Sequence, residues 1–196
     1  MEKKQIITLD TDGVIYDYYT PWIELLNKEK HTSFTLDDWT VRDGKHFFSS
    51  EKEWNDFWFR IFHDEKFYRN IKLYSNEIPY LINMLRKKRA VNIATARSCC
   101  DMEPKHQIQR LTLESFLKDS IIVDHFFFEQ DKNSVLSGSS YFVEDSFSTA
   151  KKAKERFPDI FVYLVTRPWN RDFNAKEYGL IRTSSFEEFA RTLLSN

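Results

Sequence analysis

Two carboxylates stand one residue apart near the start of the chain, in the stretch IITLDTDGV at residues 6–14. Asp10 and Asp12 follow a short apolar run, and Gly13 then lets the chain turn sharply away. Two negative charges held this close repel each other, so a fold that keeps them together usually places a cation between them. The alternative, on these residues alone, is a surface turn in which an Asp side chain accepts a backbone hydrogen bond.

A hydroxyl, an ammonium group and a second acidic pair follow later apolar runs. Thr95 ends the run in VNIATARS, Lys132 follows the segment FFFEQDK, and Glu144 with Asp145 ends SYFVEDS. Because the carboxyl ends of parallel strands meet at one edge of a sheet, we expect these groups to join the first acidic pair there. Taken singly, each has a structural explanation: a helix cap, a surface lysine, or acidic groups at the start of a helix.

This set of groups suits phosphoryl transfer. Carboxylates and a backbone carbonyl are oxygen ligands that Mg²⁺ prefers, and Asp10, Asp12 and Asp145 could stay ionised around such a cation. An ionised aspartate can attack phosphorus, and a second carboxylate two residues further on can protonate the leaving alkoxide and then activate water. Thr95 would donate a hydrogen bond to a phosphoryl oxygen, and Lys132 would offset the charge on the phosphoryl group.

The elements that must position these groups alternate along most of the chain. Short, continuous, β-branched or aromatic runs predict strands buried on both faces of a sheet. The runs are residues 6–9, 90–95, 120–123, 140–143 and 160–165. Helical periodicity separates most of them; Pro79 marks the first turn of one helix, and Ser185 with Glu188 predicts a capping box for another. The pattern predicts a doubly wound, Rossmann-like α/β fold with a parallel sheet.

Residues 17–70 break this alternation. The segment shows no convincing strand, and we expect one helix after Pro21 and another after a capping box formed by Ser50 and Glu53. Apolar side chains of the second helix recur at helical spacing at Trp54, Phe57, Trp58, Ile61 and Phe62. We therefore expect residues 1–16 and 71–196 to form the α/β core domain, and residues 17–70 to form a small helical cap domain over the strand ends.

The polar motifs together resemble those of the haloacid dehalogenase superfamily of phosphatases. The matching residues, in the family's order, are Asp10 and Asp12 in DTDGV, Thr95 in IATAR, Lys132 in FEQDK, and Glu144 with Asp145 in FVEDS. By this resemblance, Asp10 is the nucleophile and Asp12 the acid/base. The metal would be held by the Asp10 carboxylate, the Asp12 carbonyl and Asp145. The inserted segment is similar to the family's helical cap, which closes over the substrate.

A narrower resemblance is to the 5'(3')-deoxyribonucleotidase branch, which dephosphorylates nucleoside monophosphates. It rests on the segments DTDGVIYDYYTPWIELLN, QDKNSVL, YFVED and VTRPWNR. Members of that branch often have paired aspartates at the fourth motif and Pro-Tyr-Asn near the fifth strand. This chain has Glu144 with Asp145, and Trp169 in place of the tyrosine. These departures leave the phosphatase prediction intact and the pyrimidine deoxynucleotide preference open.

Substrate contacts are expected from both parts of the chain. The residues expected to contact the substrate are Arg97, Trp39, Phe47, Phe48 and Glu144. The aromatic stripe of the second inserted helix is expected to form the core of the cap, whereas Trp39, Phe47 and Phe48 lie off that stripe and are expected to face a base. Stacking on a base contributes roughly 1 to 3 kcal/mol, enough to select a nucleotide over a sugar phosphate. Arg167 could also reach a phosphate or sugar, with a peripheral ion pair as the alternative.

Composition limits the partners. The chain has 196 residues, a net charge of -1 and no apolar run near the ~20 residues that span a bilayer. Nucleic-acid polymers and membranes are therefore not expected as partners. The start does not resemble a secretory signal, and the adjacent Cys99 and Cys100 are poor candidates for a structural disulfide, so a cytoplasmic location is expected. A small nucleotide is the expected partner, and homodimer formation stays open.

Other functions remain open on the sequence. A phosphorelay receiver also places an aspartate, a hydroxyl and a lysine at strand ends, but it usually lacks a cap and is phosphorylated after its third strand. An idle binding module on the same fold is a further alternative. Among enzymes, a sugar-phosphate phosphatase and a polynucleotide 3'-phosphatase remain, although the near-neutral charge argues against the polymer substrate.

Overall fold

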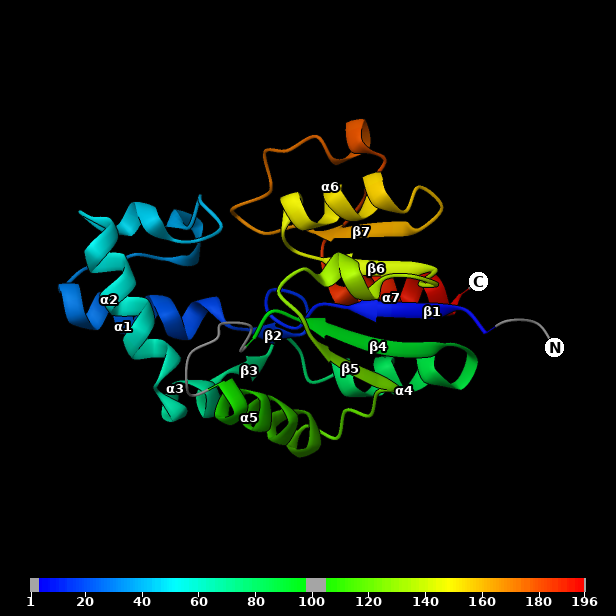
Figure 1. Ribbon diagram of the computed structural model, residues 1–196, viewed down its shortest axis with the longest axis horizontal. Coiled ribbons are helices and arrows are strands. Elements are labelled where there is room, and N and C mark those ends of the chain that lie inside the picture. Colours follow the sequence, from blue (N-terminus) through cyan, green and yellow to red (C-terminus); the bar gives the residue numbers. More distant parts are fainter. Residues whose placement is uncertain (1–3, 98–104, 196) are drawn as a thin grey trace.

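The computed structural model describes residues 4–97 and 105–195, and its centre is a six-stranded parallel sheet (Figure 1). The strands are β1 (Ile6–Leu9), β4 (Ala90–Thr95), β5 (His125–Phe128), β6 (Tyr141–Glu144), β7 (Phe161–Val165) and β8 (Ile181–Thr183). Their order across the sheet is β5-β4-β1-β6-β7-β8, and every neighbouring pair is parallel. The order turns back on either side of β1, so the prediction of a doubly wound α/β fold is confirmed.

Helices cover both faces of this sheet. They are α4 (Ile78–Lys88), α5 (Lys105–Lys118), α6 (Phe147–Arg156) and α7 (Phe186–Leu194). Helices α4 and α7 pack against each other over the face that carries Val143 and Val165, while α6 packs over the face that carries Phe142 and Val162. Successive side chains of a strand point to opposite faces, which is why these neighbouring residues belong to two separate apolar cores.

The sequence places most of these elements correctly. Strands β1 and β4 have the predicted bounds, Pro79 lies in the first turn of α4, and Ser185 caps α7 by accepting a hydrogen bond from the Glu188 N–H. Ser50 caps its helix in the same way. In both capping motifs, the glutamate side chain accepts from the residue before the cap instead of from the cap itself.

One predicted strand is wrong. Residues 120–123 contain no strand, and the strand of this region is β5, which pairs with β4. Ser120 takes a left-handed conformation (φ 57°), and the Ile121 N–H donates to the Phe116 carbonyl, so this apolar run is still closing the end of α5. Sheet pairing begins only when the Asp124 N–H donates to Val91.

Residues 17–70, here called the helical insertion, lie beside the carboxyl ends of the strands (Figure 1). The insertion contains α1 (Tyr19–Lys30), α2 (Glu51–Phe62), α3 (Glu65–Asn70) and the short turns η1 (Leu36–Asp38) and η2 (Lys45–Phe47). A short antiparallel ribbon of β2 (Tyr16–Asp17) and β3 (Lys72–Leu73) forms where the chain leaves and rejoins the core. Within the described ranges, no helix is both long and apolar enough to cross a bilayer.

Candidate active site

Asp10 lies directly after β1 and is the centre of a buried ionic cluster. Its side chain is 2% exposed, and its Oδ2 lies 2.5 Å from the Nζ of Lys132. Lys132 begins the turn η3 (Lys132–Val135), and its Nζ also lies 3.0 Å from Glu144 Oε2 at the end of β6. The Thr11 N–H donates to the other Asp10 oxygen at 2.6 Å. Three separate segments of the chain therefore meet at one sheet edge, as the sequence predicts.

Glu144 and Asp145 follow one another into this edge, but their surroundings differ. Glu144 Oε1 accepts hydrogen bonds from the N–H groups of Asp145 and Ser146, while Oε2 accepts from Lys132. Glu144 is completely buried and does not line the cavity described below, so the structure does not bring it to the substrate side as expected. It is placed to orient Lys132.

The turn after β1 approaches Asp145 very closely. Gly13 has a φ of 79°, and a methyl group at that position would overlap the Asp145 carboxylate. Only glycine combines this backbone conformation with the space that the carboxylate needs. On the other side, Trp169 Nε1 and Asn170 Nδ2 donate to the Asp145 backbone carbonyl at 3.2 and 2.7 Å.

Three carboxylates are close enough to share one cation. Asp10, Glu144 and Asp145 each offer an oxygen atom, and these atoms lie within 4.8 Å of one another. Asp145 Oδ1 accepts no hydrogen bond from the described chain. A buried carboxylate oxygen without a donor is costly, and a hard divalent cation favours oxygen ligands of this kind. The cluster therefore fits a divalent metal. The predicted ligands Asp10 and Asp145 belong to it, while a contribution from the Asp12 carbonyl stays a prediction.

The Asp12 carboxylate is instead paired with Arg97. Arg97 Nη2 lies 2.5 Å from Asp12 Oδ1, and Nε donates to both carboxylate oxygens at 2.9 to 3.0 Å. The arginine side chain is 3% exposed and its guanidinium lies over the Tyr16 ring. Arg97 also lines the cavity, so it orients Asp12 from a position within reach of a ligand.

The other two predicted polar residues lie behind the site. Thr95 is completely buried, and its Oγ1 accepts hydrogen bonds from Thr11 Oγ1 at 2.5 Å and from the Arg97 N–H at 3.2 Å. Arg167 donates from Nε to the Gly13 carbonyl and stacks on the Tyr74 ring, 4.1 Å from its centroid. Neither side chain lines the cavity.

Burial sets the electrostatics of the cluster. Loss of solvent and the nearby Glu144 raise the pKa of Asp10 to about 7, although Lys132 acts in the opposite direction. Burial also raises the pKa of Glu144. For Lys132, burial acts to lower the pKa, but Asp10 and Glu144 outweigh it and raise the pKa overall. The cluster thus holds a charged lysine and more carboxylate than that lysine can balance, which favours binding of another cation.

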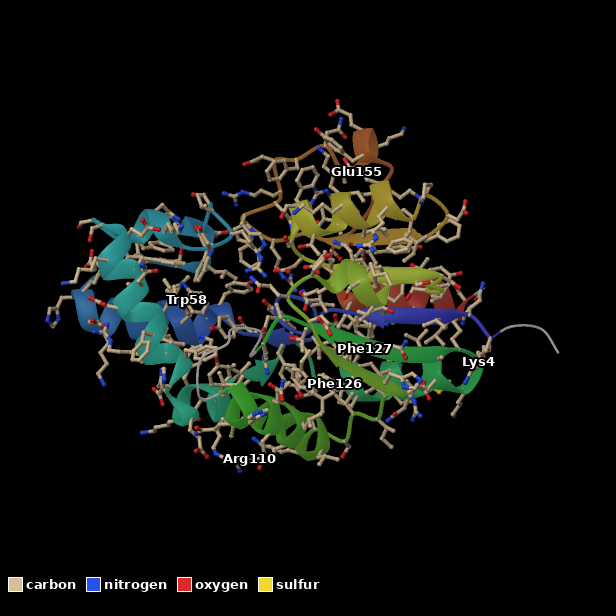
Figure 2. The ribbon with its side chains drawn as sticks, in the orientation of Figure 1. Lys4, Trp58, Arg110, Phe126, Phe127 and Glu155 are labelled. Atoms are coloured by element: carbon tan, nitrogen blue, oxygen red, sulfur yellow. The ribbon has the colours of Figure 1, made fainter. Side chains whose placement is uncertain are left out.

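A cavity of about 200 Å³ opens above these groups. Its polar wall consists of Asp10, Asp12, Arg97 and Lys132 from the core, together with Arg42, and Ala96 lies among them. Its aromatic wall consists of Tyr18, Tyr19, Trp58, Phe62 and Tyr68. Tyr18 and Trp58 stack with their ring planes 15° apart, and Figure 2 shows Trp58 within the helical insertion. The arrangement offers charge at one end and flat apolar surface at the other.

These aromatic residues are not the ones expected from the sequence. Trp39 is 0% exposed and packs 4.5 Å from the Trp22 ring, and Phe47 and Phe48 pack on the same tryptophan. None of the three expected residues lines the cavity. On α2, by contrast, Trp58 faces the cavity although it was expected in the cap core.

Helical geometry explains why two residues of the α2 stripe face the cavity. Phe57 and Ile61 of α2 are buried inside the insertion, while Trp58 and Phe62, each one residue further along, turn toward the cavity. Each residue along a helix is rotated by about 100° from the one before it. A stripe of five large apolar residues is wide, and its pattern does not show which of its sides packs inside the insertion and which faces the cavity. The tyrosines of the stretch YDYY, shortly after the first motif, are the feature of the sequence that could have identified Tyr18 as a cavity residue.

Comparison with known proteins shows the fold. No family model matches the chain, and no curated protein matches its sequence. Among solved structures, a haloacid dehalogenase-like family hydrolase from Streptococcus pneumoniae has a TM-score of 0.68 at 14% identity, over 98% of this chain and 100% of that chain. A predicted phosphatase from Clostridium acetobutylicum has a TM-score of 0.65 at 14% identity, over 98% and 99%.

A third solved structure agrees with these two. A HAD-superfamily hydrolase of subfamily IA from Geobacter sulfurreducens has a TM-score of 0.55 at 11% identity, over 97% of this chain and 100% of that chain. Each match covers nearly all of both chains, so the core and the helical insertion are both included. The chain therefore has the haloacid dehalogenase-like hydrolase fold, with a buried acidic cluster at the carboxyl edge of its sheet.

Proposed function

We propose that this protein is a Mg²⁺-dependent phosphomonoesterase that forms an aspartyl-phosphate and acts on nucleoside monophosphates. One observation carries the proposal: Asp10 faces a cavity that has Lys132 and Asp12 on one wall and aromatic rings on the opposite wall. The fold shared with haloacid dehalogenase-like hydrolases supports the phosphatase part. The aromatic wall supports the nucleotide part. A 5'(3')-deoxyribonucleotidase type of activity is proposed from the sequence resemblance alone.

Asp10 acts as the nucleophile in this mechanism. A carboxylate oxygen of Asp10 forms a bond to phosphorus, and the bond from phosphorus to the ester oxygen breaks. Asp12 donates a proton to the leaving oxygen, and Arg97 holds the Asp12 carboxylate in place. Asp12 then removes a proton from water, the water oxygen attacks phosphorus, and the acyl phosphate bond breaks to release inorganic phosphate and restore Asp10. Lys132 offsets negative charge beside the reacting group throughout.

The cation would be held by Asp10 and Asp145, with Glu144 behind them and the Asp12 carbonyl as a further predicted ligand. When bound, Mg²⁺ would stabilise the negative charge on the transferring phosphoryl group. The predicted hydrogen bond from Thr95 to a phosphoryl oxygen is not part of the proposal, because the Thr95 hydroxyl is buried behind the cavity wall. The helical insertion acts as a cap domain in it, because its aromatic residues supply the wall opposite the carboxylates.

The substrate class follows from the cavity and the charge. Stacking of a base on an aromatic ring contributes roughly 1 to 3 kcal/mol, and Trp58 and Phe62 offer such rings. A polymer would need a basic surface to bind its phosphates, and the net charge of the chain is -1. A small, free nucleotide therefore fits this site better than the end of a nucleic acid.

The test is phosphate release from a panel of ribo- and deoxyribonucleoside 5'- and 3'-monophosphates, sugar phosphates and p-nitrophenyl phosphate, with Mg²⁺ and with EDTA. We expect nucleotide turnover that requires Mg²⁺ and is lost in Asp10→Asn. Asp159→Asn, an exposed carboxylate before β7, is the control and should keep full activity. Turnover of sugar phosphates alone would reject the nucleotide part, and no release from any ester would reject the phosphatase.

A further inference from the structure

Arg42 reaches the acidic cluster from the helical insertion. It lies in the loop between η1 and η2, and among the cavity-lining residues of the described chain it is the only cation that comes from the insertion. Its Nη2 lies 3.5 Å from Asp145 Oδ1, the carboxylate oxygen that accepts no hydrogen bond from the described chain. The Arg42 side chain is 43% exposed, whereas that of Asp145 is completely buried.

Two aromatic rings direct this arginine toward Asp145. The guanidinium carbon lies 5.2 Å from the Tyr19 ring centroid and 5.8 Å from that of Trp169, and the two rings lie 4.1 Å apart. Tyr19 also donates its hydroxyl to the second oxygen of Asp145. Cation and carboxylate are therefore aligned by the same ring, because a guanidinium is attracted to aromatic faces.

The contact with Asp145 is looser than the other ion pairs of the site. Lys132 lies 2.5 Å from Asp10 and Arg97 lies 2.5 Å from Asp12, both with almost fully buried cations. Charge-assisted hydrogen bonds normally measure about 2.7 to 2.9 Å, so 3.5 Å is an attraction without a formed bond. No hydrogen bond joins the Arg42 guanidinium to the rest of the described chain. Its donors are thus free to bind a ligand in the cavity.

The charges indicate what that ligand would be. Four carboxylates surround the site, and two of its three cations are committed to Asp10 and Asp12. A divalent cation would take over the role of neutralising Asp145, and Arg42 would then lack a partner. A guanidinium pairs well with a phosphate, since its planar donors match two oxygens at once.

We propose that Arg42 binds an anionic oxygen of the phosphate ester, and that in the ligand-free protein it serves as a counter-ion of Asp145 that competes with the divalent cation. The substrate half of this inference rests on the proposed phosphatase function. Arg42 would contact Asp145 before the cation binds and the substrate afterwards. The contacts of the insertion would therefore depend on whether the cation and the substrate are bound.

Calorimetric titration of Arg42→Ala and Arg42→Lys with two probes tests this inference. With Mg²⁺ alone, Arg42→Ala should bind more tightly than wild type, by about three- to tenfold, because a competing positive charge is removed. With inorganic phosphate in the presence of Mg²⁺, the same variant should bind more weakly, by about 10- to 100-fold. Arg42→Lys keeps the charge and should fall between wild type and Arg42→Ala with both probes.

The matched control is Arg171→Ala. Arg171 is also half exposed and also joins core and insertion, through a 3.5 Å ion pair with Asp37, but it lies outside the cavity lining. This variant should bind both probes like wild type. If Arg42→Ala behaves like Arg171→Ala, the inference is overturned. Tighter Mg²⁺ binding with unchanged phosphate binding would overturn the substrate role of Arg42.

Both titrations are independent of turnover. If the ester panel shows no hydrolysis while phosphate binding still depends on Arg42, the proposed phosphatase fails and the anion site stands. If esters are hydrolysed with an unchanged phosphate affinity in Arg42→Ala, the phosphatase stands and the inference about Arg42 fails.

Discussion

The sheet edge and the helical insertion each contain an ion pair of the same length in a different environment. At the sheet edge, Lys132 and Asp10 lie 2.5 Å apart with side chains that are 6% and 2% exposed. In the insertion, Arg60 and Glu29 also lie 2.5 Å apart, but these side chains are 56% and 47% exposed. Water screens the second pair and not the first. Two ion pairs with the same separation therefore have very different interaction energies. The reactive groups lie in the region from which water is excluded.

The two regions also differ in what they offer a ligand. The sheet edge contributes carboxylates and cations whose positions follow from the ends of paired strands. The insertion contributes aromatic rings and the loosely paired Arg42. We infer that the core supplies the reaction and the insertion supplies the choice of substrate. The following predictions test that division, beginning with the largest expected effect.

Lys132→Met should cause the largest loss. The substitution leaves the buried Asp10 and Glu144 without their cation, and breaking a buried pair in this way costs about 3 to 5 kcal/mol of unfolding free energy. Urea unfolding followed by circular dichroism measures this loss. Lys151→Met removes a lysine whose side chain is 39% exposed, and it is the control. Similar stability of the two variants would contradict the claim that the core cluster is held together by this cation.

Trp58→Ala should change substrate choice and not chemistry. Loss of a stacking surface should raise KM for nucleotides by roughly 10- to 100-fold, with little effect on kcat for a small aliphatic phosphate ester. Steady-state kinetics on the two substrates measures the ratio. Trp54→Ala, one helical turn earlier and outside the cavity lining, is the matched control. An equal loss for both substrates would show that Trp58 acts through the fold of the insertion.

Mg²⁺ affinity should fall as the pH is lowered through 7. The raised pKa of Asp10 means that this carboxylate takes up a proton near pH 7 in the metal-free protein, and a protonated carboxyl group is a poor ligand. The dissociation constant should therefore rise below pH 7, approaching about tenfold per pH unit. Calorimetry from about pH 8 to about pH 5 measures this slope. Trp58→Ala should show the same slope, because the effect belongs to the core.

Arg60→Ala should have the smallest effect. The ion pair with Glu29 is exposed to water, so its loss should lower the unfolding free energy by less than about 1 kcal/mol. Urea unfolding of Arg60→Ala and Lys132→Met, measured under the same conditions, compares the unfolding free energy lost from two ion pairs of equal separation. A loss as large as that of Lys132→Met would show that burial does not govern the energies of these pairs.

Much of the core was predictable because its signals are local. The runs that form β1 and β4 are short and mainly apolar, and each leads to a polar residue at the sheet edge: Asp10 directly after β1, and Thr95 as the last residue of β4. The error at residues 120–123 arose because an apolar run can close a helix as well as form a strand. Ser120 in a left-handed conformation ends α5 there, and nothing in the run itself indicates that turn.

The sequence by itself determined which chemical groups end the strands and in what order, since strand pattern and chain direction bring successive carboxyl ends to one edge of a parallel sheet. Only the tertiary structure decided how these groups pair, with Lys132 on Asp10, Arg97 on Asp12 and Arg42 beside Asp145. It also decided which aromatic rings face the cavity. Such choices depend on side-chain rotation and on contacts between distant segments, and neither leaves a periodic mark along the chain.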